Sequence, residues 1–452
     1  MQQVSKKIAE YFRRKKVLIC GFGREGKSTY RMLTETATVE SLAVADRNGE
    51  VMKELASSGV TCYEGPDYLD KACLYDIVML TPGIPHTQIS GKVMPDQIRS
   101  QTSVMLELAG KNIIGVTGTK GKSTTSVLIT EMLRAGGKKP LLVGNIGKPP
   151  FDYLSEIRDD TLIVFELSAH QLEWVKNSPD YAVLLNLYQE HLDHFGGYER
   201  YREAKFNLIK FIHATGHIWT TEIALKEIKN VLQEIPGQLH IIPQPEQGSF
   251  FLELPSGPVK VEVPEGYAMR GRHNLLNVSV SASVAHHLGV SKEVINRVVR
   301  NFKGLPHRLE YLGCYAGIHI YNDSIATIPQ ATVAALESLD KVDTLILGGY
   351  DRGIDYKLLI DYLSLHPVPV LLLTGPAGER IGREVSELNL GDTQLIFMKD
   401  FDELSYLIPE HTPVGGTCLL SPAAASYDRF MNFEQRGDAL KKIAESISLS
   451  AT

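Results

Sequence analysis

The sequence predicts an α/β protein in which two Rossmann-like domains flank a central P-loop-like domain that carries a small antiparallel sheet. Three observations lead to this fold class. The chain has 452 residues, which suits three domains at about 100 to 200 residues each. Short apolar segments alternate with helical ones, as in parallel sheets. Two glycine-rich turns each join a strand to a helix. We place the domains at residues 1–109, 110–306 and 307–452.

The first domain begins with an apolar strand at residues 16–20 and a glycine turn. Gly21, Gly23 and Gly26 follow this strand and precede a helical stretch that reaches about Leu33. A second strand at residues 41–45 ends at Asp46, and a further strand is expected at 77–80. An acid about 20 residues beyond such a turn is typical of a Rossmann-like nucleotide site. The turn alone would more often indicate a dinucleotide, but the absence of a paired hydride-transfer site argues against a dehydrogenase.

The second domain opens with a strand at residues 113–116, and further strands are expected at 140–143, 162–167 and 182–186. Between residues 238 and 263 the pattern changes to short alternating stretches, among them 249–254 and 258–263. We interpret this segment as a small antiparallel sheet appended to the domain. The third domain supplies strands at 319–322, 344–347, 370–373 and 417–420.

The composition excludes several classes of protein. With a formal net charge of −6, from 47 basic and 53 acidic residues, the chain lacks the excess of basic residues typical of nucleic-acid-binding proteins. The apolar runs are far shorter than the roughly 20 residues needed to span a bilayer, and the charged N-terminal segment lacks the apolar stretch of a signal peptide. Five scattered cysteines show no metal-ligand spacing: Cys20, Cys62, Cys73, Cys314 and Cys418. We therefore expect a cytoplasmic monomer with reduced thiols and without a membrane or nucleic-acid partner.

The second glycine-rich turn has the composition of a phosphate-binding loop. It lies between a strand and a helix, where backbone N–H groups and a helix N-terminus converge on an anion. We expect Lys122 to neutralise the β and γ phosphates, and the hydroxyl of Ser123 or Thr124 to bind Mg²⁺. The glycine spacing departs from the Walker pattern. The candidate ATP-binding residues are Gly118, Thr119, Lys120, Gly121, Lys122, Ser123 and Thr124.

The run TGTKGKSTT at residues 117–125 resembles the ATP loop of the Mur ligases and of folylpolyglutamate synthetase, which usually read TGTNGKST. Lys120 stands where most relatives have Asn. Further motifs that resemble the Mur ligases follow in order along the chain. GRHNLLN at 271–277 resembles G-x-H-N-x-x-N, which implies that Asn274 and Asn277 lie near the ATP base. HRLE at 307–310 resembles H-R-x-E, which implies that Arg308 reaches the ATP phosphates. YNDS at 321–324 follows in register, which implies that Asp323 lies near the ribose.

The resemblance also implies a site for two Mg²⁺ ions. NLYQEHLDH at residues 186–194 resembles N-x-x-x-D-H-x-D, with Glu190 in place of Asp, whereas His194 has no counterpart and is expected at the surface. Lys205 matches a lysine that is carbamylated in these enzymes, a change that turns an ammonium group into an anionic oxygen ligand. The implied metal ligands are Ser123, Glu166, His191 and carbamylated Lys205, and the implied catalytic residues are Lys122, His191, Lys205 and Arg308.

The run SPAAASYDRFMNFEQRG at residues 421–437 resembles SPAxASxDxFxNFEQRG of the Mur ligases that add glutamate. This resemblance implies ATP-driven addition of glutamate to UDP-N-acetylmuramoyl-L-alanine. The implied glutamate-binding residues are Thr327, Arg352, Ser426 and Phe433. The implied binding residues for the UDP substrate are Gly21, Gly23, Gly26, Asp46, Asn145 and Gln171.

One departure bears on which glutamate is added. The segment NDSIAT at residues 322–327 differs from the usual NDSKAT, and Ile325 cannot offer a lysine's charge to a glutamate carboxylate. Arg352 remains as a cation for it. A branch of the family with GREG in the first glycine turn, as at residues 23–26, is associated with L-glutamate. D-glutamate is the commoner case and is our prediction, with L-glutamate as the alternative.

In the implied reaction the alanyl carboxylate attacks the γ-phosphate of ATP and forms an acyl phosphate and ADP. The neutral amine of glutamate then attacks the acyl phosphate, and the tetrahedral intermediate yields amide and phosphate. No residue identifies itself as the base for the amine. Closure of the C-terminal domain over the ligands is expected. One rival is a folylpolyglutamate-type ligase, which lacks the first domain. The other is a nucleotide-gated binding protein, which would not need Glu166, His191, Lys205 and Arg308 together.

Overall fold

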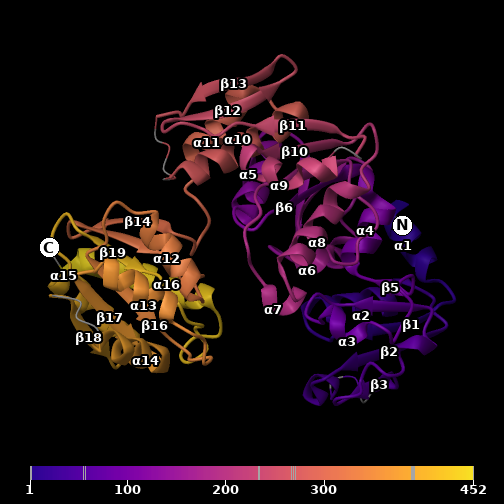
Figure 1. The fold of residues 1–452 in the computed structure, drawn as a ribbon, viewed down its shortest axis with the longest axis horizontal. Coiled ribbons are helices and arrows are strands. Elements are labelled where there is room, and N and C mark those ends of the chain that lie inside the picture. Colours follow the sequence, from indigo (N-terminus) through magenta and orange to yellow (C-terminus); the bar gives the residue numbers. More distant parts are fainter. Residues whose placement is uncertain are drawn as a thin grey trace. The chain divides into compact units, whose positions relative to one another are not determined.

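The computed structural model describes residues 3–53, 55, 58–232, 235–265, 267, 269, 271–387 and 392–450. The chain divides into two compact units, of which the first is Met1–Gly266 with Arg272–Asn301 and the second is Tyr267–Gly271 with Phe302–Thr452. Both are α/β structures (Figure 1). The first unit contains two parallel sheets and a two-stranded sheet, and the second contains one mixed sheet. The predicted fold class is therefore confirmed, and the first two predicted domains pack as one unit.

The N-terminal sheet is parallel, with the strand order β3-β2-β1-β4-β5. Its central strand is the apolar segment KVLIC, in which the last four residues are buried. This strand pairs with β2 on one side and β4 on the other, so the glycine turn lies where the strand order reverses, the usual place for a ligand in an open α/β sheet. The strands are β1 (Lys16–Cys20), β2 (Ser41–Asp46), β3 (Thr61–Glu64), β4 (Ile77–Leu80) and β5 (Ile98–Arg99).

Helices and single turns of 3-10 helix connect these strands. Helix α2 starts directly after the glycine turn and buries Met32 and Leu33 against a core that also contains Val17 and Ile19 of β1. The helices are α1 (Gln3–Phe12), α2 (Arg24–Thr36), α3 (His86–Ile89) and α4 (Gln101–Ala109), and the 3-10 turns are η1 (Gly49–Met52), η3 (Ala72–Leu74) and η4 (Gly110–Asn112).

The central sheet is also parallel, with the order β11-β10-β9-β6-β8-β7. The five residues of β6 are all buried, and the glycine-rich loop follows this inner strand directly. The strands are β6 (Ile113–Thr117), β7 (Lys139–Gly144), β8 (Thr161–Glu166), β9 (Tyr181–Leu184), β10 (His217–Thr221) and β11 (Gln238–Ile242). The helical elements are α5 (Lys122–Ala135), η5 (Pro150–Tyr153), α6 (Ala169–Leu172), α7 (Leu192–Phe195), α8 (Tyr198–Lys210), α9 (Glu222–Leu232), α10 (Arg272–His287) and α11 (Lys292–Asn301).

The small antiparallel sheet is confirmed for β12 (Ser249–Leu254) and β13 (Gly257–Glu262). Its interpretation as starting at residue 238 is wrong, because β11 pairs in parallel with β10 as the edge of the central sheet. An edge strand with exposed residues alternates much like an antiparallel one, so periodicity alone does not separate them. The small sheet packs on α10, where the Oγ atom of Ser279 accepts a hydrogen bond from Phe251 N at 2.9 Å.

The sheet of the second unit has the order β14-β15-β19-β16-β17-β18. Only β14 runs antiparallel to its neighbour. The strands are β14 (Glu310–Tyr315), β15 (Ile318–Asn322), β16 (Thr344–Gly348), β17 (Val370–Thr374), β18 (Gln394–Met398) and β19 (Thr417–Leu420). The helices are α12 (Pro329–Glu337), α13 (Lys357–Leu365), α14 (Gly375–Ser386), η6 (Phe401–Glu403), α15 (Leu404–His411) and α16 (Phe433–Ser450).

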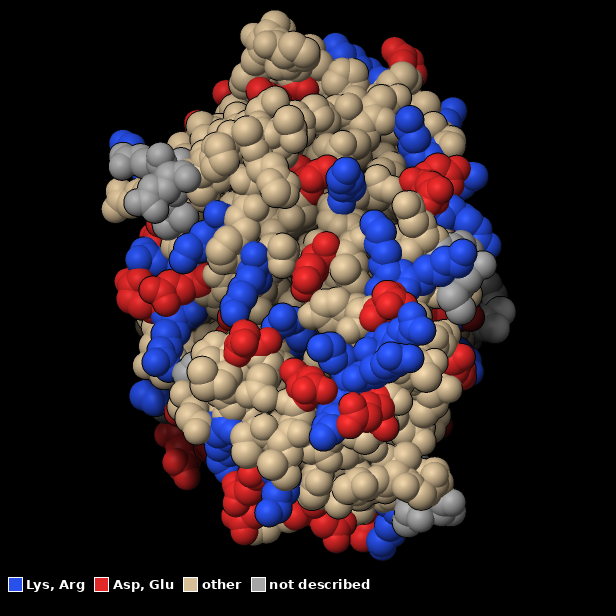
Figure 2. Space-filling view, turned by 90° about the vertical axis from the view of Figure 1, so that its right-hand side faces the viewer, with Lys and Arg blue, Asp and Glu red and all other residues tan. Residues whose placement is uncertain are grey.

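The surface carries charges of both signs. Figure 2 shows one face of the molecule, on which acidic and basic side chains are interspersed. Such a mixture matches the formal net charge of −6. Within the part of the chain that the structure describes, no helix has the combination of length and apolar character needed to cross a bilayer.

Candidate active site

Two glycines shape the loop between β6 and α5. Gly118 has a φ of 154° and Gly121 a φ of 85°, values that residues with a side chain rarely adopt. A Cβ atom on Gly121 would lie 2.4 Å from Oδ1 of Asn277, and one on Gly118 would lie 2.9 Å from Cβ of Leu185. The loop ends at Lys122, the first residue of α5. The N-terminus of α5 therefore adjoins the loop, as in anion-binding sites.

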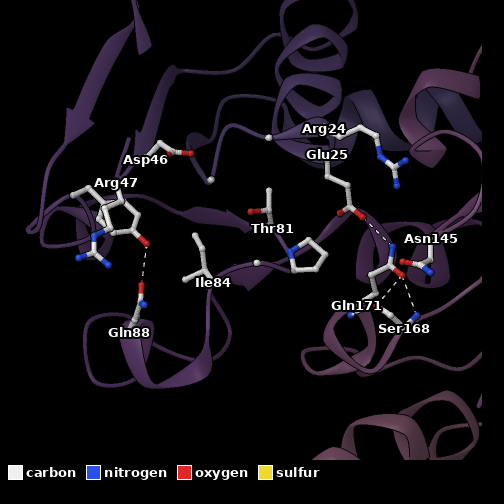
Figure 3. A pocket seen from close by; sticks show the side chains of 15 residues that line it. Arg24, Glu25, Asp46, Arg47, Thr81, Ile84, Gln88, Asn145, Ser168 and Gln171 are labelled. Atoms are coloured by element: carbon white, nitrogen blue, oxygen red, sulfur yellow. Dashed lines mark hydrogen bonds between the residues drawn. The ribbon is translucent and has the colours of Figure 1, made fainter. Parts of the chain in front are cut away.

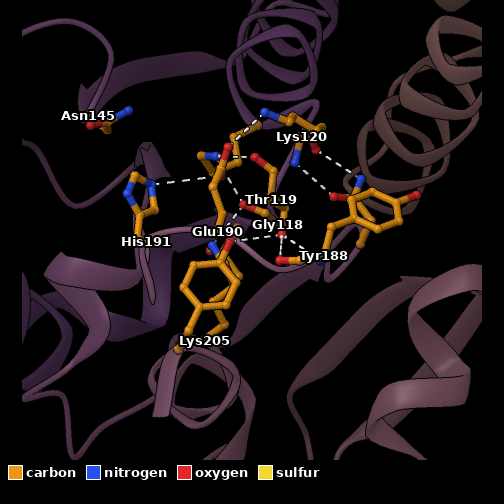
Figure 4. Close-up of polar contacts among 12 residues, drawn as sticks. Gly118, Thr119, Lys120, Asn145, Tyr188, Glu190, His191 and Lys205 are labelled. Carbon is orange, nitrogen blue, oxygen red and sulfur yellow. Dashed lines mark hydrogen bonds and ion pairs between the residues drawn. The ribbon is translucent and has the colours of Figure 1, made fainter. Parts of the chain in front are cut away.

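The segment after β9 holds this loop in place. The side-chain amide of Asn186 accepts a hydrogen bond from Lys120 N at 2.8 Å and donates one to Lys120 O at 3.0 Å. Thr119 N donates to the backbone oxygen of Asn186 at 3.0 Å, and the Thr119 hydroxyl accepts from Tyr188 N at 2.9 Å. Figure 4 shows these contacts around the loop. No role was predicted for Asn186 beyond its place in a motif, and the structure makes it a clamp on the loop.

Lys122 and Lys205 both donate to the same loop carbonyl group. The Nζ atom of Lys122 lies 3.0 Å from Gly118 O, and that of Lys205 lies 2.8 Å from it. Lys205 belongs to α8 and is only 2% exposed. Burial lowers its pKa well below the usual 10.5, and the nearby charge of Lys122 lowers this pKa further. Because carbamates form from neutral amines, this environment suits the carbamylation implied for Lys205.

Lys120 and Glu190 form an ion pair beside the loop. The Nζ atom of Lys120 lies 2.8 Å from Oε1 of Glu190. Burial acts to raise the pKa of Glu190, but the hydrogen bond and charge of Lys120 outweigh burial and lower this pKa. His191 follows with its Nε2 atom 3.8 Å from Glu190 Oε2 and its side chain 48% exposed. The structure thus brings the predicted ligand His191 to the loop through Glu190.

His194 is not the surface residue that we expected. Its side chain is 11% exposed, and its Nε2 atom lies 3.3 Å from Oε2 of Glu173. Its ring packs edge-on against those of His170 and Phe195. The expectation was wrong because the short helix α7 turns this side chain towards the small cluster around Phe195.

Glu166 offers an unused oxygen in a buried position. It is the last residue of β8 and pairs with Val116 of β6, just before the loop. Its side chain is fully buried, and Oε1 accepts a hydrogen bond from Nδ2 of Asn145 at 2.8 Å. Oε2 has no hydrogen-bond partner among the described residues. A buried carboxylate oxygen needs compensation, and a hard cation such as Mg²⁺ prefers oxygen ligands. The free oxygen of Glu166 therefore fits the role of a Mg²⁺ ligand.

A cavity of about 590 Å³ lies between the N-terminal sheet and the loops of the central sheet. Five of the six residues predicted to bind the UDP substrate line it: Gly21, Gly23, Asp46, Asn145 and Gln171. Gly26 lies behind the turn, where a Cβ atom would lie 2.0 Å from Gly21 O, so its role is close packing. Figure 3 shows Arg47 and Gln88 towards one end of the cavity and Asn145, Ser168 and Gln171 towards the other.

Polar contacts organise the walls of this cavity. The carboxylate of Asp46 accepts hydrogen bonds from Phe22 N at 2.6 Å and Asn48 N at 2.8 Å, so it holds the glycine turn against β2. Gln171 donates to Oε1 of Glu25 at 2.9 Å, which links the two parts of the first unit. Burial raises the pKa of Glu25. Sequence reasoning missed Glu25 as a cavity residue, although it belongs to the GREG turn.

The predicted base-binding residues lie on α10. Asn277 is buried, contacts the loop at Gly121 and accepts a hydrogen bond from the Thr125 hydroxyl at 3.4 Å. Asn274 lies nearly one turn earlier on the same helix. The structure thus brings α10 to the start of α5, and contact of the two asparagines with the ATP base stays a prediction.

The second unit brings the predicted glutamate-binding segments together. Arg352 donates from Nη2 to Thr327 O at 2.7 Å. Ser426 is 2% exposed and follows β19, whereas Phe433 begins α16. Arg308 is exposed on a turn that begins with His307 at a φ of 61°.

The carboxylate of Asp323 anchors that turn. Oδ1 accepts a hydrogen bond from Leu309 N at 3.0 Å and Oδ2 accepts one from the Ser421 hydroxyl at 2.8 Å. Burial raises the pKa of Asp323 to about 7, against the opposing effect of these hydrogen bonds. In this unit Asp323 therefore positions the backbone beside Arg308.

Arg436 ties these segments together, and no role was predicted for it. It is 2% exposed, and burial lowers its pKa to about 10. The guanidinium group donates to Oγ and O of Ser324 at 3.0 and 2.9 Å and to Ala424 O at 3.0 Å. It also reaches Gly348 O at 3.4 Å and Ala425 O at 3.3 Å. A buried arginine that binds so many backbone oxygens fixes three loops at once.

Known proteins resemble the chain in sequence and fold. The family model of the Mur ligase middle domain matches residues 116–285. The UDP-N-acetylmuramoylalanine–D-glutamate ligase of Koribacter versatilis is 30% identical, over 96% of this chain and 98% of the relative. The enzyme of the same name from Streptococcus agalactiae serotype III is 32% identical, over 96% and 98%. Among solved structures, MurF ligase from Thermotoga maritima in complex with ADP superimposes with a TM-score of 0.56 at 17% identity, over 97% of this chain and 96% of that one. MurC from Thermotoga maritima gives a TM-score of 0.56 at 17% identity, over 96% and 99%.

Proposed function

The chain belongs to the Mur ligase family, and we propose that it joins glutamate to the alanyl carboxyl group of UDP-N-acetylmuramoyl-L-alanine at the expense of ATP. This reaction belongs to the synthesis of the peptidoglycan precursor, and thus to cell-wall biogenesis, cell shape and division. One observation carries the proposal. The amide of Asn145, in the wall of the 590 Å³ cavity, donates to Glu166 beside the ATP loop at 2.8 Å. A substrate in the cavity can therefore present its reacting end to the nucleotide.

The cavity has room and charge for a nucleotide sugar. Arg24 and Arg47 line it and supply positive charge for a diphosphate. We place the uridine towards Asp46 and Arg47, and the alanyl end towards Asn145 and Gln171. In this orientation the carboxylate to be activated leaves the cavity on the side of the ATP loop.

The first step transfers the γ-phosphoryl group of ATP to that carboxylate. The new P–O bond forms as the bond to the β-phosphate oxygen breaks, and ADP leaves. Lys122 is the residue that would follow the negative charge during transfer, by exchanging its present bonds to Gly118 O and Thr119 O for phosphate oxygens. Arg308, from the second unit, remains a predicted partner of the same phosphates, and Asn274 and Asn277 remain predicted contacts of the base.

The second step forms the amide. The neutral amine of glutamate attacks the acyl phosphate, its proton leaves and inorganic phosphate is released. The second unit would hold glutamate through Arg352 and Thr327, which already contact each other at 2.7 Å, together with Ser426 and Phe433. Closure of the second unit over the ligands remains a prediction, and compaction in small-angle scattering on addition of an ATP analogue and the UDP-sugar would test it.

Two Mg²⁺ ions are part of the proposal. When bound, they supply positive charge that screens the phosphates from the incoming carboxylate. Ser123 and Glu166 would hold one ion, and His191 with carbamylated Lys205 would hold the other. The orphaned Oε2 atom of Glu166 and the lowered pKa of buried Lys205 support these assignments.

We propose D-glutamate as the substrate because of the names of the relatives. Both of the relatives described above are named for D-glutamate. A second candidate, L-glutamate, is favoured by Ile325, which is half-buried where most relatives have a lysine. We further propose that the protein is cytoplasmic, since all five cysteines are unpaired thiols. We also propose that it acts as a monomer.

Phosphate release from ATP tests the function. With UDP-N-acetylmuramoyl-L-alanine present, we expect release to depend on added D-glutamate and Lys122→Met to abolish it. Lys138→Met, which removes an exposed lysine, is the matched control and should match the wild type. Activity with L-glutamate alone would replace the stereochemical assignment. Absence of glutamate-dependent release with either isomer would refute the ligase, and release with folate and glutamate would favour the folylpolyglutamate-type rival.

A further inference from the structure

Three histidines converge at the edge of the central sheet, away from the ATP loop in the sequence and in the fold. His217 begins β10, His240 lies in the edge strand β11, and His287 ends α10. One nitrogen from each ring lies within 4.8 Å of the other two. Nδ1 of His217 and Nε2 of His240 are 3.0 Å apart, within hydrogen-bond distance.

Aromatic neighbours pack against these rings but do not explain why the rings converge. Trp219 is fully buried and stacks on His240 with a centroid distance of 4.7 Å and an angle of 12°. Tyr181 lies 5.9 Å from His217 in a nearly parallel orientation. An aromatic stack would be satisfied by Phe or Tyr at all three positions. It does not require three ring nitrogens to point at one another.

The charges around the cluster suit neutral imidazoles. Burial, together with the charges of His217 and His287, lowers the pKa of His240 to about 4. Burial also lowers the pKa values of His217 and His287. For none of the three histidines does a carboxylate contribute to the pKa shift. Neutral imidazole is the form that ligates a metal, whereas a pH switch would require a stabilised imidazolium.

We propose that His217, His240 and His287 form a binding site for a borderline-soft divalent metal ion of the Zn²⁺ class. A ligand distance of about 2.1 Å in tetrahedral geometry separates the nitrogens by about 3.4 Å. The ion would therefore replace the hydrogen bond between His217 and His240 and draw together nitrogens that now lie within 4.8 Å of one another. His287 is exposed, which leaves a fourth position open to water. A bound ion would join the edge strand β11 to β10 and to α10, and the site is distinct from the Mg²⁺ site at the ATP loop.

Cobalt spectroscopy tests the site on the full-length, chelator-treated protein in excess Mg²⁺, which occupies the oxygen-rich sites at the ATP loop. We expect visible absorption bands of tetrahedral Co²⁺ that saturate at one equivalent and are abolished by one equivalent of Zn²⁺. Loss of one ligand in His217→Gln, His240→Gln or His287→Gln should weaken binding at least about tenfold, since even changes around a ligand cost 10- to 100-fold. His287→Gln alters an exposed side chain, so it remains informative if the other two variants do not fold.

Two controls separate this site from other histidines. His366→Gln removes an exposed histidine of the second unit, and His191→Gln removes the predicted ligand at the ATP loop. Both should bind Co²⁺ as the wild type does. The proposal is overturned if the wild type gives no saturable band, if His287→Gln binds with unchanged affinity, or if His191→Gln removes the band.

Discussion

The ammonium group of Lys120 lies 2.8 Å from the Oε1 atom of Glu190, across the mouth of the ATP loop. Both residues depart from the usual pattern of the family, in which Asn and Asp occupy these positions. The two departures are thus in direct contact. Lys120 adds a positive charge, whereas Glu190 keeps the negative charge of the usual Asp on a longer side chain. The pair connects the ATP loop to the segment that carries His191.

A double-mutant cycle should detect this pairing. Lys120→Asn and Glu190→Asp each remove the contact, and we expect the double variant to recover part of what either single variant loses. Since Lys120 is 56% exposed and Glu190 25% exposed, the coupling energy should be about 0.2 to 1 kcal/mol. The Michaelis constant for ATP measures it, and strictly additive effects would show that the two substitutions are independent.

Gly121→Ala should impair ATP turnover far more than it impairs folding. The positive φ of Gly121 costs an alanine roughly 1 kcal/mol, and its Cβ would also lie 2.4 Å from Asn277 Oδ1. Gly137→Ala is the matched control, because Gly137 has a φ of 77° with no atom within 4 Å of its Cβ position. We expect similar melting temperatures for the two variants and a loss of phosphate release in Gly121→Ala alone. Equal activity in both would exclude the clash with Asn277 as a cause.

Carbamylation of Lys205 should be visible by ¹³C NMR. The lowered pKa of this buried lysine favours the neutral amine, so protein equilibrated with ¹³C-bicarbonate should show a carbamate resonance. Lys205→Met should lack the resonance and lose phosphate release. Lys210→Met, at the exposed end of the same helix, should retain both. A carbamate signal that persists in Lys205→Met would assign it to another lysine.

Arg436→Lys should destabilise the second unit and weaken glutamate binding. Lysine cannot reach the oxygen atoms that the guanidinium group now satisfies, and we expect a loss of about 3 kcal/mol or more in the free energy of unfolding. Because the tethered loops carry Thr327, Arg352 and Ser426, the Michaelis constant for glutamate should rise more than that for ATP. Arg429→Lys, at an exposed position, should change neither constant. A uniform loss of activity with both constants unchanged would reduce Arg436 to a purely structural role.

Asp323 should make the second unit less stable as pH rises. Burial raises its pKa from 3.8 to about 7, so between these values the folded protein retains a proton that the unfolded chain has released. The free energy of unfolding therefore falls from about pH 4 to about pH 7, by no more than about 4 kcal/mol. Asp323→Asn should lack this slope, whereas Asp340→Asn, at an exposed site, should keep it. Urea denaturation at several pH values gives the slopes, and parallel curves for wild type and Asp323→Asn would contradict the raised pKa.

Largely buried strands were predictable because a short apolar run between turn residues indicates a buried strand. The runs at β1 (Lys16–Cys20), β4 (Ile77–Leu80) and β19 (Thr417–Leu420) match the expected ranges. Strand β10 (His217–Thr221) was missed because HIWTT contains too few aliphatic residues for such a run. Strand β18 (Gln394–Met398) was missed although QLIFM contains four consecutive apolar residues. It lies at the edge of its sheet, and Met398 alone among its residues is buried.

Some residues of the candidate site could be predicted from the sequence and others could not. Lys122, Glu166 and Lys205 could be named because each stands in a motif next to a strand or on a helix. Asn186, Glu25 and Arg436 act through partners that lie far away in the sequence, such as Gln171 for Glu25, 146 positions on. No local period or composition encodes these contacts, so they required the folded chain.

Asn145 lines the 590 Å³ cavity and also donates a hydrogen bond to Glu166 Oε1. A ligand in the cavity that reorients the amide of Asn145 therefore changes the electrostatic potential at the carboxylate of Glu166. Affinities for the nucleotide sugar and for metal-bound ATP are then thermodynamically linked, and each ligand must alter the binding of the other by the same factor. Titration of either ligand, with and without saturating amounts of the other, gives that factor, and Asn145→Ala should bring it towards one.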